Sequence, residues 1–176
     1  AYLLAIIEQV SDDYSVDPNA IFLAGHSNGG FMSYRMACEH ADTIAGIASL
    51  AGATFADPAD CTPLEPVSVL QVHGTDDTVI AYDGGAIFGN DYPSARQTVE
   101  SWVASNSCDP TPSVTADTLD LDAAVDGSES DTEVFTGCEL GAQVELWTID
   151  DGSHVPDVTD EFSAAVVDFL LDHPKP

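Results

Sequence analysis

The chain has 176 residues, of which 44% are hydrophobic, and its 31 Asp and Glu against 3 Lys and Arg give a formal net charge of −28. A chain of this length and apolar content forms one globular domain with its own core, spanning residues 1–176, rather than a disordered acidic tail. Nucleic acid and anionic lipid surfaces attract basic proteins, so the charge excludes both as partners. The longest apolar run, residues 1–7, is far shorter than the ~20 residues that span a bilayer, so we expect no membrane anchor.

Apolar residues recur at helical spacing from Tyr2 to Val10, which predicts an amphipathic helix ending near Tyr14. Four later segments are short, apolar on both faces and followed by Gly, Asp or His, as is typical of buried parallel strands. These strands are predicted at residues 20–24, 44–50, 67–72 and 144–149. Helices are predicted between and after them, at residues 29–40, 94–106 and 159–171. In the last helix we expect four side chains to face inward, those of Ala164, Val167, Leu170 and Leu171.

The alternation of strands and helices predicts an α/β fold. Crossover connections of this kind are right-handed, so the helices should cover both faces of a mostly parallel sheet. Residues 108–138 interrupt the alternation with Thr, Asp, Ser and Gly, and within them residues 132–135 are expected to pair with the strand at 144–149. Acidic residues gather at 117–131 without the ligand spacing of an EF-hand calcium loop, so we favour a solvated loop over a cation site.

The carboxylates are spread along the whole sequence, which predicts an acidic shell around the folded domain. Repulsion among like charges destabilises a compact state at low ionic strength, and salt relieves it because the Debye length is about 3 Å at 1 M. We therefore expect a halophilic, salt-adapted protein. An ordinary acidic protein is the alternative.

The four cysteines are Cys38, Cys61, Cys108 and Cys138, with no Cys-x-x-Cys and no His at zinc-finger spacing, so no metal site is expected. Four cysteines allow three disulfide pairings. Pairing of nearest neighbours, Cys38 with Cys61 and Cys108 with Cys138, would close two modest loops and stabilise the fold by about 3–4 kcal/mol each. These bridges would imply an oxidising compartment, whereas four free thiols in a cytosolic protein are the alternative.

The segment Gly25-His26-Ser27-Asn28-Gly29 follows the first predicted strand and opens a helix. This is the context that a G-x-S-x-G nucleophile elbow requires, and we expect both flanking glycines to be needed so that strand and helix can approach. Ser27 is therefore the candidate nucleophile. A simple glycine-rich turn is the alternative interpretation.

A serine hydroxyl is a poor nucleophile until a base takes its proton, and that base needs an acid to fix its tautomer. Two further strands end in suitable residues, in His73-Gly74-Thr75-Asp76-Asp77 and in Asp150-Asp151-Gly152-Ser153-His154. The order Ser, Asp, His is that of α/β-hydrolases. His154 is the best placed of the five histidines to act as base, and spacing alone leaves Asp76 and Asp77 both open as the acid.

These motifs together resemble an esterase family, that of the polyhydroxybutyrate depolymerases and the feruloyl or acetylxylan esterases. The resemblance covers nearly the whole chain and is carried by residues 25–32, residues 73–79 with Tyr82 and Gly84-Gly85, and residues 152–154. It implies a three-layer α/β-hydrolase fold without a cofactor, Asp77 as the acid and His154 as the base. It also implies a bridge between Cys108 and Cys138 and secretion.

The resemblance further implies an oxyanion hole that uses the backbone N–H of Asn28, with His26, Tyr82 and Val155 near the substrate. Two positions depart from the family pattern. Val155-Pro156 replaces an aromatic residue after the catalytic His, and Asp151 stands where Gly is favoured.

Family members carry additional strands and a His-Gly loop ahead of the first helix seen here, and that loop supplies a second oxyanion donor. This sequence has no Gly before Gly25. We therefore expect an N-terminally shortened hydrolase whose strand at 20–24 lies at a bare sheet edge. Such an edge pairs readily with another chain, so a homodimer promoted by salt is expected.

The sequence thus predicts a secreted, salt-adapted carboxylic ester hydrolase for short-chain or aryl and sugar esters, with a small ester as its only partner class. A peptidase or thioesterase could use the same three residues. From a different functional class, a non-catalytic remnant or binding module of the hydrolase fold is the alternative.

Overall fold

The computed structural model describes residues 2–114 and 118–176. Its helices are α1 (Tyr2–Asp13), α2 (Asn28–Glu39), α3 (Ala95–Ser105) and α4 (Asp160–Asp172), with short 3₁₀ turns at Pro58–Asp60 and Glu139–Gly141. Its strands are β1 (Phe22–His26), β2 (Gly46–Leu50), β3 (Ser68–Gly74), β4 (Gly85–Ile87), β5 (Asn90–Tyr92), β6 (Ser113–Val114), β7 (Ser130–Phe135) and β8 (Val144–Ile149). The predicted helices and the four predicted strands are all present, with their bounds shifted by a few residues at most.

One sheet forms the centre of the molecule. Its strands follow the order β1-β2-β3-β8-β7-β6. The pairs β1–β2, β2–β3 and β3–β8 are parallel, so the carboxyl ends of these four strands lie at the same edge of the sheet. β7 pairs with β8 in antiparallel fashion and places Thr132 opposite Trp147, which confirms the strand predicted at 132–135.

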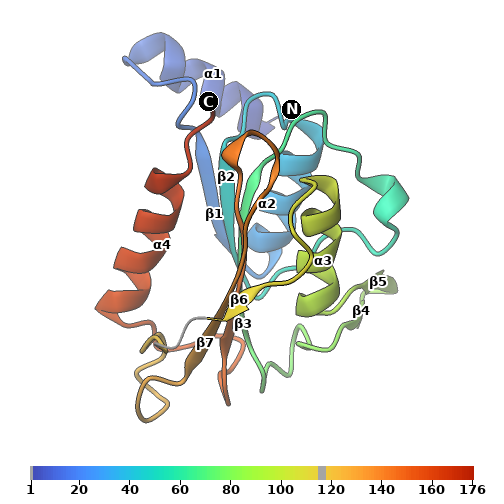
Figure 1. Ribbon diagram of the computed structural model, residues 1–176, viewed down its shortest axis with the longest axis vertical. Helices are drawn as coiled ribbons and strands as arrows, with labels where there is room; N and C mark the ends of the chain where they lie inside the picture. The colour runs from blue at the N-terminus through green and yellow to red at the C-terminus, as the bar shows by residue number, and fades with distance from the viewer. Residues whose placement is uncertain (1, 115–117) are drawn as a thin grey trace.

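Helices cover both faces of the sheet, as the α/β prediction requires. Figure 1 shows α4 on one side of the sheet and α2 with α3 on the other. Because side chains alternate between the faces of a strand, Val69 joins the apolar core beneath α2 and α3, whereas Leu70 and Val72 join the core beneath α4. The fold is therefore the three-layer arrangement of the α/β-hydrolases.

The inward face predicted for α4 is wrong at three of its four positions. Ala164 is exposed, and Val167 and Leu171 are 51% and 63% exposed, whereas Leu170 packs toward the core. The residues that contact the sheet side are Phe162, Ala165, Val166, Phe169 and Leu170. Apolar residues occur almost all round this helix, so periodicity alone could not select the buried face, and the two Phe side chains fill the core instead.

Both expected disulfides are present. Cys38 on α2 is bridged to Cys61, and Cys108 is bridged to Cys138. The sequence separations of 23 and 30 residues show that each bridge closes a local loop beside the core rather than joining distant parts of the chain.

β1 is an edge strand in the described structure, because β2 is its sole partner strand there. α1 lies across the end of the sheet from which β1 begins (Figure 1), and none of its residues is buried. The pairing of two copies through β1 stays a prediction. Within the described residues, no helix combines the length and apolar character that a bilayer span requires.

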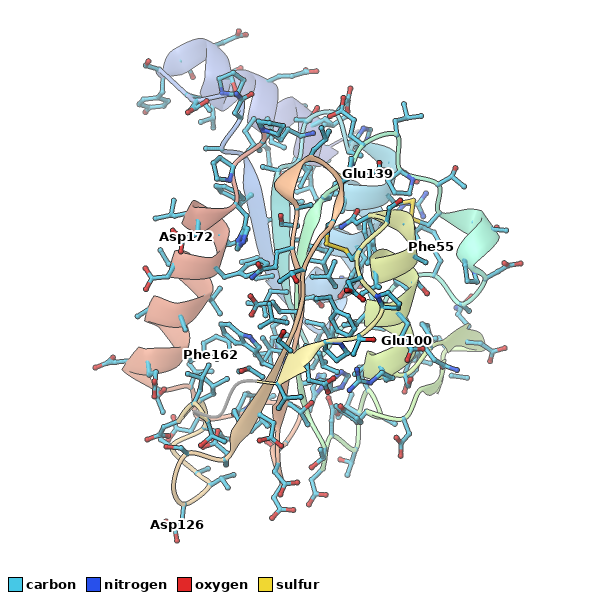
Figure 2. All side chains as sticks on the ribbon, in the orientation of Figure 1. Phe55, Glu100, Asp126, Glu139, Phe162 and Asp172 are labelled. Carbon is cyan, nitrogen blue, oxygen red and sulfur yellow. A yellow bond between two sulfur atoms is a disulfide. The ribbon has the colours of Figure 1, made fainter. Side chains whose placement is uncertain are left out.

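Acidic side chains lie at widely separated places on the described part of the molecule. Figure 2 shows them from Asp172 on α4 to Asp126 in the loop before β7 and to Glu139 near the opposite end. The sequence's three fixed cations, Arg35, Arg96 and Lys175, are each in an ion pair with a glutamate. The remaining negative charge therefore has no fixed cation to balance it.

Candidate active site

Ser27 stands at the junction of β1 and α2. Its φ of 54° and ψ of −118° lie outside the regions that L-residues favour, and its N–H donates to the carbonyl of Leu50 over 2.8 Å. A Cβ at Gly25 would overlap the backbone of Gly29, so Gly25 has to be glycine. At Gly29, in contrast, a Cβ would meet open space, so the expectation that both glycines are needed is wrong for Gly29.

The turn after β3 holds Asp77. Its Oδ1 accepts hydrogen bonds of 2.8 Å from both the Val79 and the Ile80 N–H, and the side chain is buried. Burial opposes ionisation of this carboxyl, but hydrogen bonds from His154 and from the two N–H groups prevail, so the pKa of Asp77 lies below its ordinary value. The neighbouring Asp76 is exposed.

Close approach of two loops brings the His154 segment to Asp77. The Asp76 N–H donates to the Gly152 carbonyl over 2.9 Å, and a Cβ at Gly74 would overlap that same carbonyl. Asp151 has a φ of 56°, in the left-handed region, which explains why a glycine is favoured at this position. The loops after β3 and β8 therefore meet at the carboxyl edge of the sheet.

The three candidate side chains form one hydrogen-bonded chain. His154 Nδ1 lies 2.7 Å from Asp77 Oδ2, and His154 Nε2 lies 3.0 Å from Ser27 Oγ. Asp77 Oδ2 has no proton to give when ionised, so Nδ1 carries the hydrogen and Nε2 is free to accept from the serine. This arrangement can transfer a proton from the serine hydroxyl to the imidazole.

A cleft of about 860 Å³ opens beside Ser27 and Asn28. The large apolar side chains that line it are those of Phe31, Phe55, Ile80, Ile87, Phe88 and Tyr92. Three carboxylates, those of Asp57, Asp60 and Asp91, complete its rim, and no Lys or Arg lines it. The cleft suits a neutral substrate with an aromatic or aliphatic group.

The hairpin of β4 and β5 supplies much of this cleft, and sequence reasoning missed it. Phe88 at its tip is 97% exposed and has a φ of 52° beside Gly89. The sequence Phe-Gly-Asn-Asp-Tyr contained a turn signal, but three-residue strands are too short for a periodic pattern to show.

The structure gives other contacts to the three residues expected near the substrate, and their role there stays a prediction. His26 Nε2 donates to the carbonyl of His154 over 2.7 Å. Tyr82 places its hydroxyl 2.9 Å from Thr148 Oγ1 and its ring edge-on to His73. Val155 is 70% exposed. None of these three residues is among those that line the cleft beside Ser27.

Asn28 is the first residue of α2, so its backbone N–H lies at the start of this helix. The first N–H groups of a helix have no carbonyl partner within the helix, and the helix dipole adds partial positive charge there. This N–H is therefore suited to an oxyanion that forms next to Ser27.

Sequence reasoning gave no role to two buried polar residues of β3. Gln71 and His73 are 0% and 1% exposed and alternate with Leu70 and Val72. Two polar side chains at i and i+2 in an otherwise apolar strand are a detectable signal, since burying them requires hydrogen-bond partners. Burial lowers the pKa of His73, against the opposing effects of its Ile80 and Asp77 contacts, and keeps the imidazole neutral.

Two carboxylates of the acidic insert, residues 117–131, bind backbone N–H groups. Glu129 Oε1 accepts from the N–H groups of Leu121 and Asp122, and Asp122 Oδ1 accepts from Ala124 and Asp157. Among the described residues, no group of three or more His, Cys, Asp or Glu could hold a metal ion. Residue 117 of this insert lies outside the described residues.

Known proteins with similar sequences are esterases. The chain is 30% identical to feruloyl esterase C of Emericella nidulans over an alignment of 177 positions, which covers 94% of this chain and 57% of that protein. It is also 30% identical to feruloyl esterase B of Piromyces equi over 156 residues, which cover 84% of this chain and 27% of that protein. The chain thus spans about half or less of the length of these relatives.

A solved structure shows the same fold. The acetyl xylan esterase from Aspergillus awamori superposes with a TM-score of 0.59 at 13% identity, covering 96% of this chain and 65% of that one. The family model described as phospholipase/carboxylesterase matches residues 2–107. The chain therefore belongs to the phospholipase/carboxylesterase family of α/β-hydrolases.

Proposed function

We propose that this protein hydrolyses carboxylic esters through an acyl-enzyme on Ser27. The observation that carries the proposal is the hydrogen-bonded chain from Ser27 through His154 to Asp77, at the carboxyl edge of a hydrolase sheet. His154 takes the serine proton as Oγ attacks the ester carbonyl, and it then gives that proton to the leaving alcohol. In the second half of the reaction His154 activates water, and Asp77 orients the imidazole throughout.

The tetrahedral intermediate carries a negative oxygen that needs a donor. The Asn28 N–H at the start of α2 supplies one hydrogen bond, and the helix dipole supports it. Removing one such donor typically lowers turnover by about 10²- to 10³-fold.

The proposed substrates are neutral esters with an aryl or short aliphatic acyl group. The aromatic lining of the cleft fits such a group, and its three carboxylates repel anions. Two relatives are named as feruloyl esterases, which agrees with an aromatic acyl group. Sugar alcohols are the proposed leaving groups on the resemblance to acetylxylan esterases alone.

We also propose that the protein is secreted and adapted to salt. The two disulfides suit an oxidising environment, where such bonds persist. The unbalanced carboxylates suit a medium whose salt screens their repulsion.

Ester hydrolysis by the wild type and Ser27→Ala tests the proposed activity. With p-nitrophenyl acetate and methyl ferulate, we expect Ser27→Ala to lose activity by a factor of about 10⁶, because removal of a catalytic serine has this scale of effect. Ser33→Ala is the matched control, since that hydroxyl bonds to the Gly29 carbonyl within α2.

Thioester and peptide substrates in the same assay separate an esterase from a thioesterase or peptidase. A folded wild type without activity on any of these substrates would favour a binding module, and a fully active Ser27→Ala would overturn the catalytic assignment.

A further inference from the structure

A buried chain of polar side chains leads from the core beneath α2 to the acid of the proposed triad. The Tyr34 hydroxyl donates to Gln71 Oε1 over 2.8 Å, and Gln71 Nε2 lies 3.1 Å from His73 Nδ1. Tyr34, Gln71 and His73 are 0%, 0% and 1% exposed. Water therefore does not compete for these hydrogen bonds.

The surroundings fix the orientation of the Gln71 amide. Its Nε2 also donates to the carbonyl of Gly52 over 2.8 Å. A flipped amide would place Oε1 against that carbonyl oxygen, and two acceptors repel each other. Gln71 therefore presents an N–H to His73 Nδ1, and the imidazole must accept there.

The tautomer of His73 follows from this constraint. A neutral imidazole that accepts at Nδ1 carries its hydrogen on Nε2. His73 Nε2 lies 2.8 Å from the carbonyl of Ile80 and 3.4 Å from Asp77 Oδ2. Its hydrogen is thus directed at the turn that holds Asp77.

This turn fixes both oxygens of the carboxylate. The Val79 and Ile80 N–H groups bind Oδ1, while His73 anchors the Ile80 carbonyl at the end of the same turn. Asp77 Oδ2 is then free to accept from His154 Nδ1, which lies 2.7 Å away. His73 Nε2 lies 3.4 Å from the same oxygen. Loss of the His73 donor would free the turn and allow the carboxylate to rotate.

Stability alone does not explain so polar a core. Buried polar groups gain little net stability over well-packed apolar ones, and a partly satisfied network is costly. The network also connects to Gly52, two residues before Thr54 in the wall of the cleft. It therefore links the cleft wall and the acid to one rigid strand.

We propose that His73, oriented by Gln71 and Tyr34, is a positioning residue that holds the Asp77 carboxylate in register with His154. The inference rests on the proposed function of the Ser27, His154 and Asp77 side chains. His73 touches neither substrate nor the reacting atoms, so it should affect kcat much more than KM.

The first test reads the tautomer in the unaltered protein. The ¹⁵N chemical shifts of labelled histidine, assigned to His73 by comparison with His73→Gln or, if that variant does not fold, by through-bond experiments, distinguish the three states of an imidazole. We expect the neutral Nε2–H form at pH 7. A neutral Nδ1–H form or an imidazolium would overturn the proposal, whatever the variants do.

The second test compares two variants of His73 whose amide side chains differ in length. In His73→Gln the longer side chain puts an N–H near the position of Nε2, whereas the shorter side chain of His73→Asn leaves the Ile80 carbonyl without a donor. We expect His73→Asn to lower kcat by about 10- to 100-fold, the usual scale for residues that orient a functional group, and His73→Gln to recover most of it.

A spectroscopic signature accompanies the rates. The strongly deshielded proton between His154 Nδ1 and Asp77 Oδ2 should persist in His73→Gln and broaden or disappear in His73→Asn. Asn106→Leu is the control for destabilisation alone, because it breaks the buried bonds to Val67 at the other end of β3 and should leave kcat unchanged.

Equal kcat values and unchanged proton signals in the two His73 variants would overturn the positioning role. If Ser27→Ala is inactive while His73→Asn is fully active, only this inference fails. If Ser27→Ala keeps wild-type activity, the proposed function fails with it.

Discussion

At the scale of single residues, Asp76 and Asp77 show how neighbouring carboxyls come to differ. Asp77 is buried and receives two backbone N–H groups, whereas Asp76 is exposed at the surface of the same turn. Only a carboxylate with fixed geometry can hold an imidazole in one tautomer and stabilise its positive charge during the reaction.

Asp77→Asn should therefore lower kcat by a factor of about 10⁴, the effect of placing an amide beside a catalytic histidine. Asp76→Asn removes the same charge one residue away and should change kcat little. Steady-state hydrolysis of p-nitrophenyl acetate measures both. The reverse ranking would assign the acid to Asp76.

Glu145 offers a test of burial and pH. It lies on β8, 8% exposed, and accepts from Trp147 Nε1 over 2.7 Å and from Gln143. Burial raises the pKa of Glu145 more than these hydrogen bonds lower it. The folded state therefore prefers the protonated form. This stabilisation is present below the unfolded pKa and is lost as pH rises through the folded one.

Glu145→Gln should consequently raise the Tm at pH 7 and leave it almost unchanged at pH 4, where the native carboxyl is largely protonated. For a domain of this size, 1 kcal/mol corresponds to about 2–4 °C. Glu139→Gln, at an exposed position, is the matched control for the loss of one negative charge. Equal gains in the two variants would show that net charge, not burial, is responsible.

At the scale of elements, the elbow between β1 and α2 depends on one glycine of its motif and not on the other. Gly25→Ala places a methyl group against the Gly29 backbone and should destabilise the fold by about 3 kcal/mol. Gly29→Ala adds a methyl group in open space within α2 and should be neutral or stabilising by up to about 1 kcal/mol. Urea unfolding measures both variants, and equal losses would contradict the geometry.

The edge strand β1 carries the prediction of a dimer. Its outer backbone groups have no strand partner among the described residues, and its sequence contains no Lys or Pro to discourage pairing. Two chains of −28 repel each other, so association should increase with salt. Light scattering of the 176-residue chain across a NaCl series should show this, and a monomer under all conditions would count against it.

Local sequence patterns predicted the elements better than the contacts between them. Strand period and glycine-rich turns located Ser27, His154 and the pair Asp76 and Asp77, because parallel strands bring their carboxyl ends to one edge. The choice of Asp77 within that pair came from the family resemblance alone. The buried face of α4 and the β4–β5 hairpin could not be predicted, since each depends on packing against distant residues. His73 was set aside for a related reason, as its partners Tyr34 and Ile80 come from other segments.

At the scale of the whole molecule, the net charge of −28 determines how stability responds to salt. All three fixed cations are already in ion pairs, so added salt has little attraction to weaken and much repulsion to screen. The Tm should therefore rise between millimolar and molar NaCl or KCl. The experiment uses chloride salts because sulfate raises the stability of proteins in general, which would hide the effect of charge screening. A flat or falling Tm would show that the carboxylates are compensated locally.

The distribution of the proposed triad along the chain has a consequence for refolding kinetics. Ser27 and His154 are 127 residues apart, and Asp77 and His154 are 77 apart, whereas each disulfide closes a short loop. Parallel pairings between such distant segments raise the contact order and form slowly. Helical circular dichroism should recover early, and hydrolytic activity should return only when β8 docks beside β3.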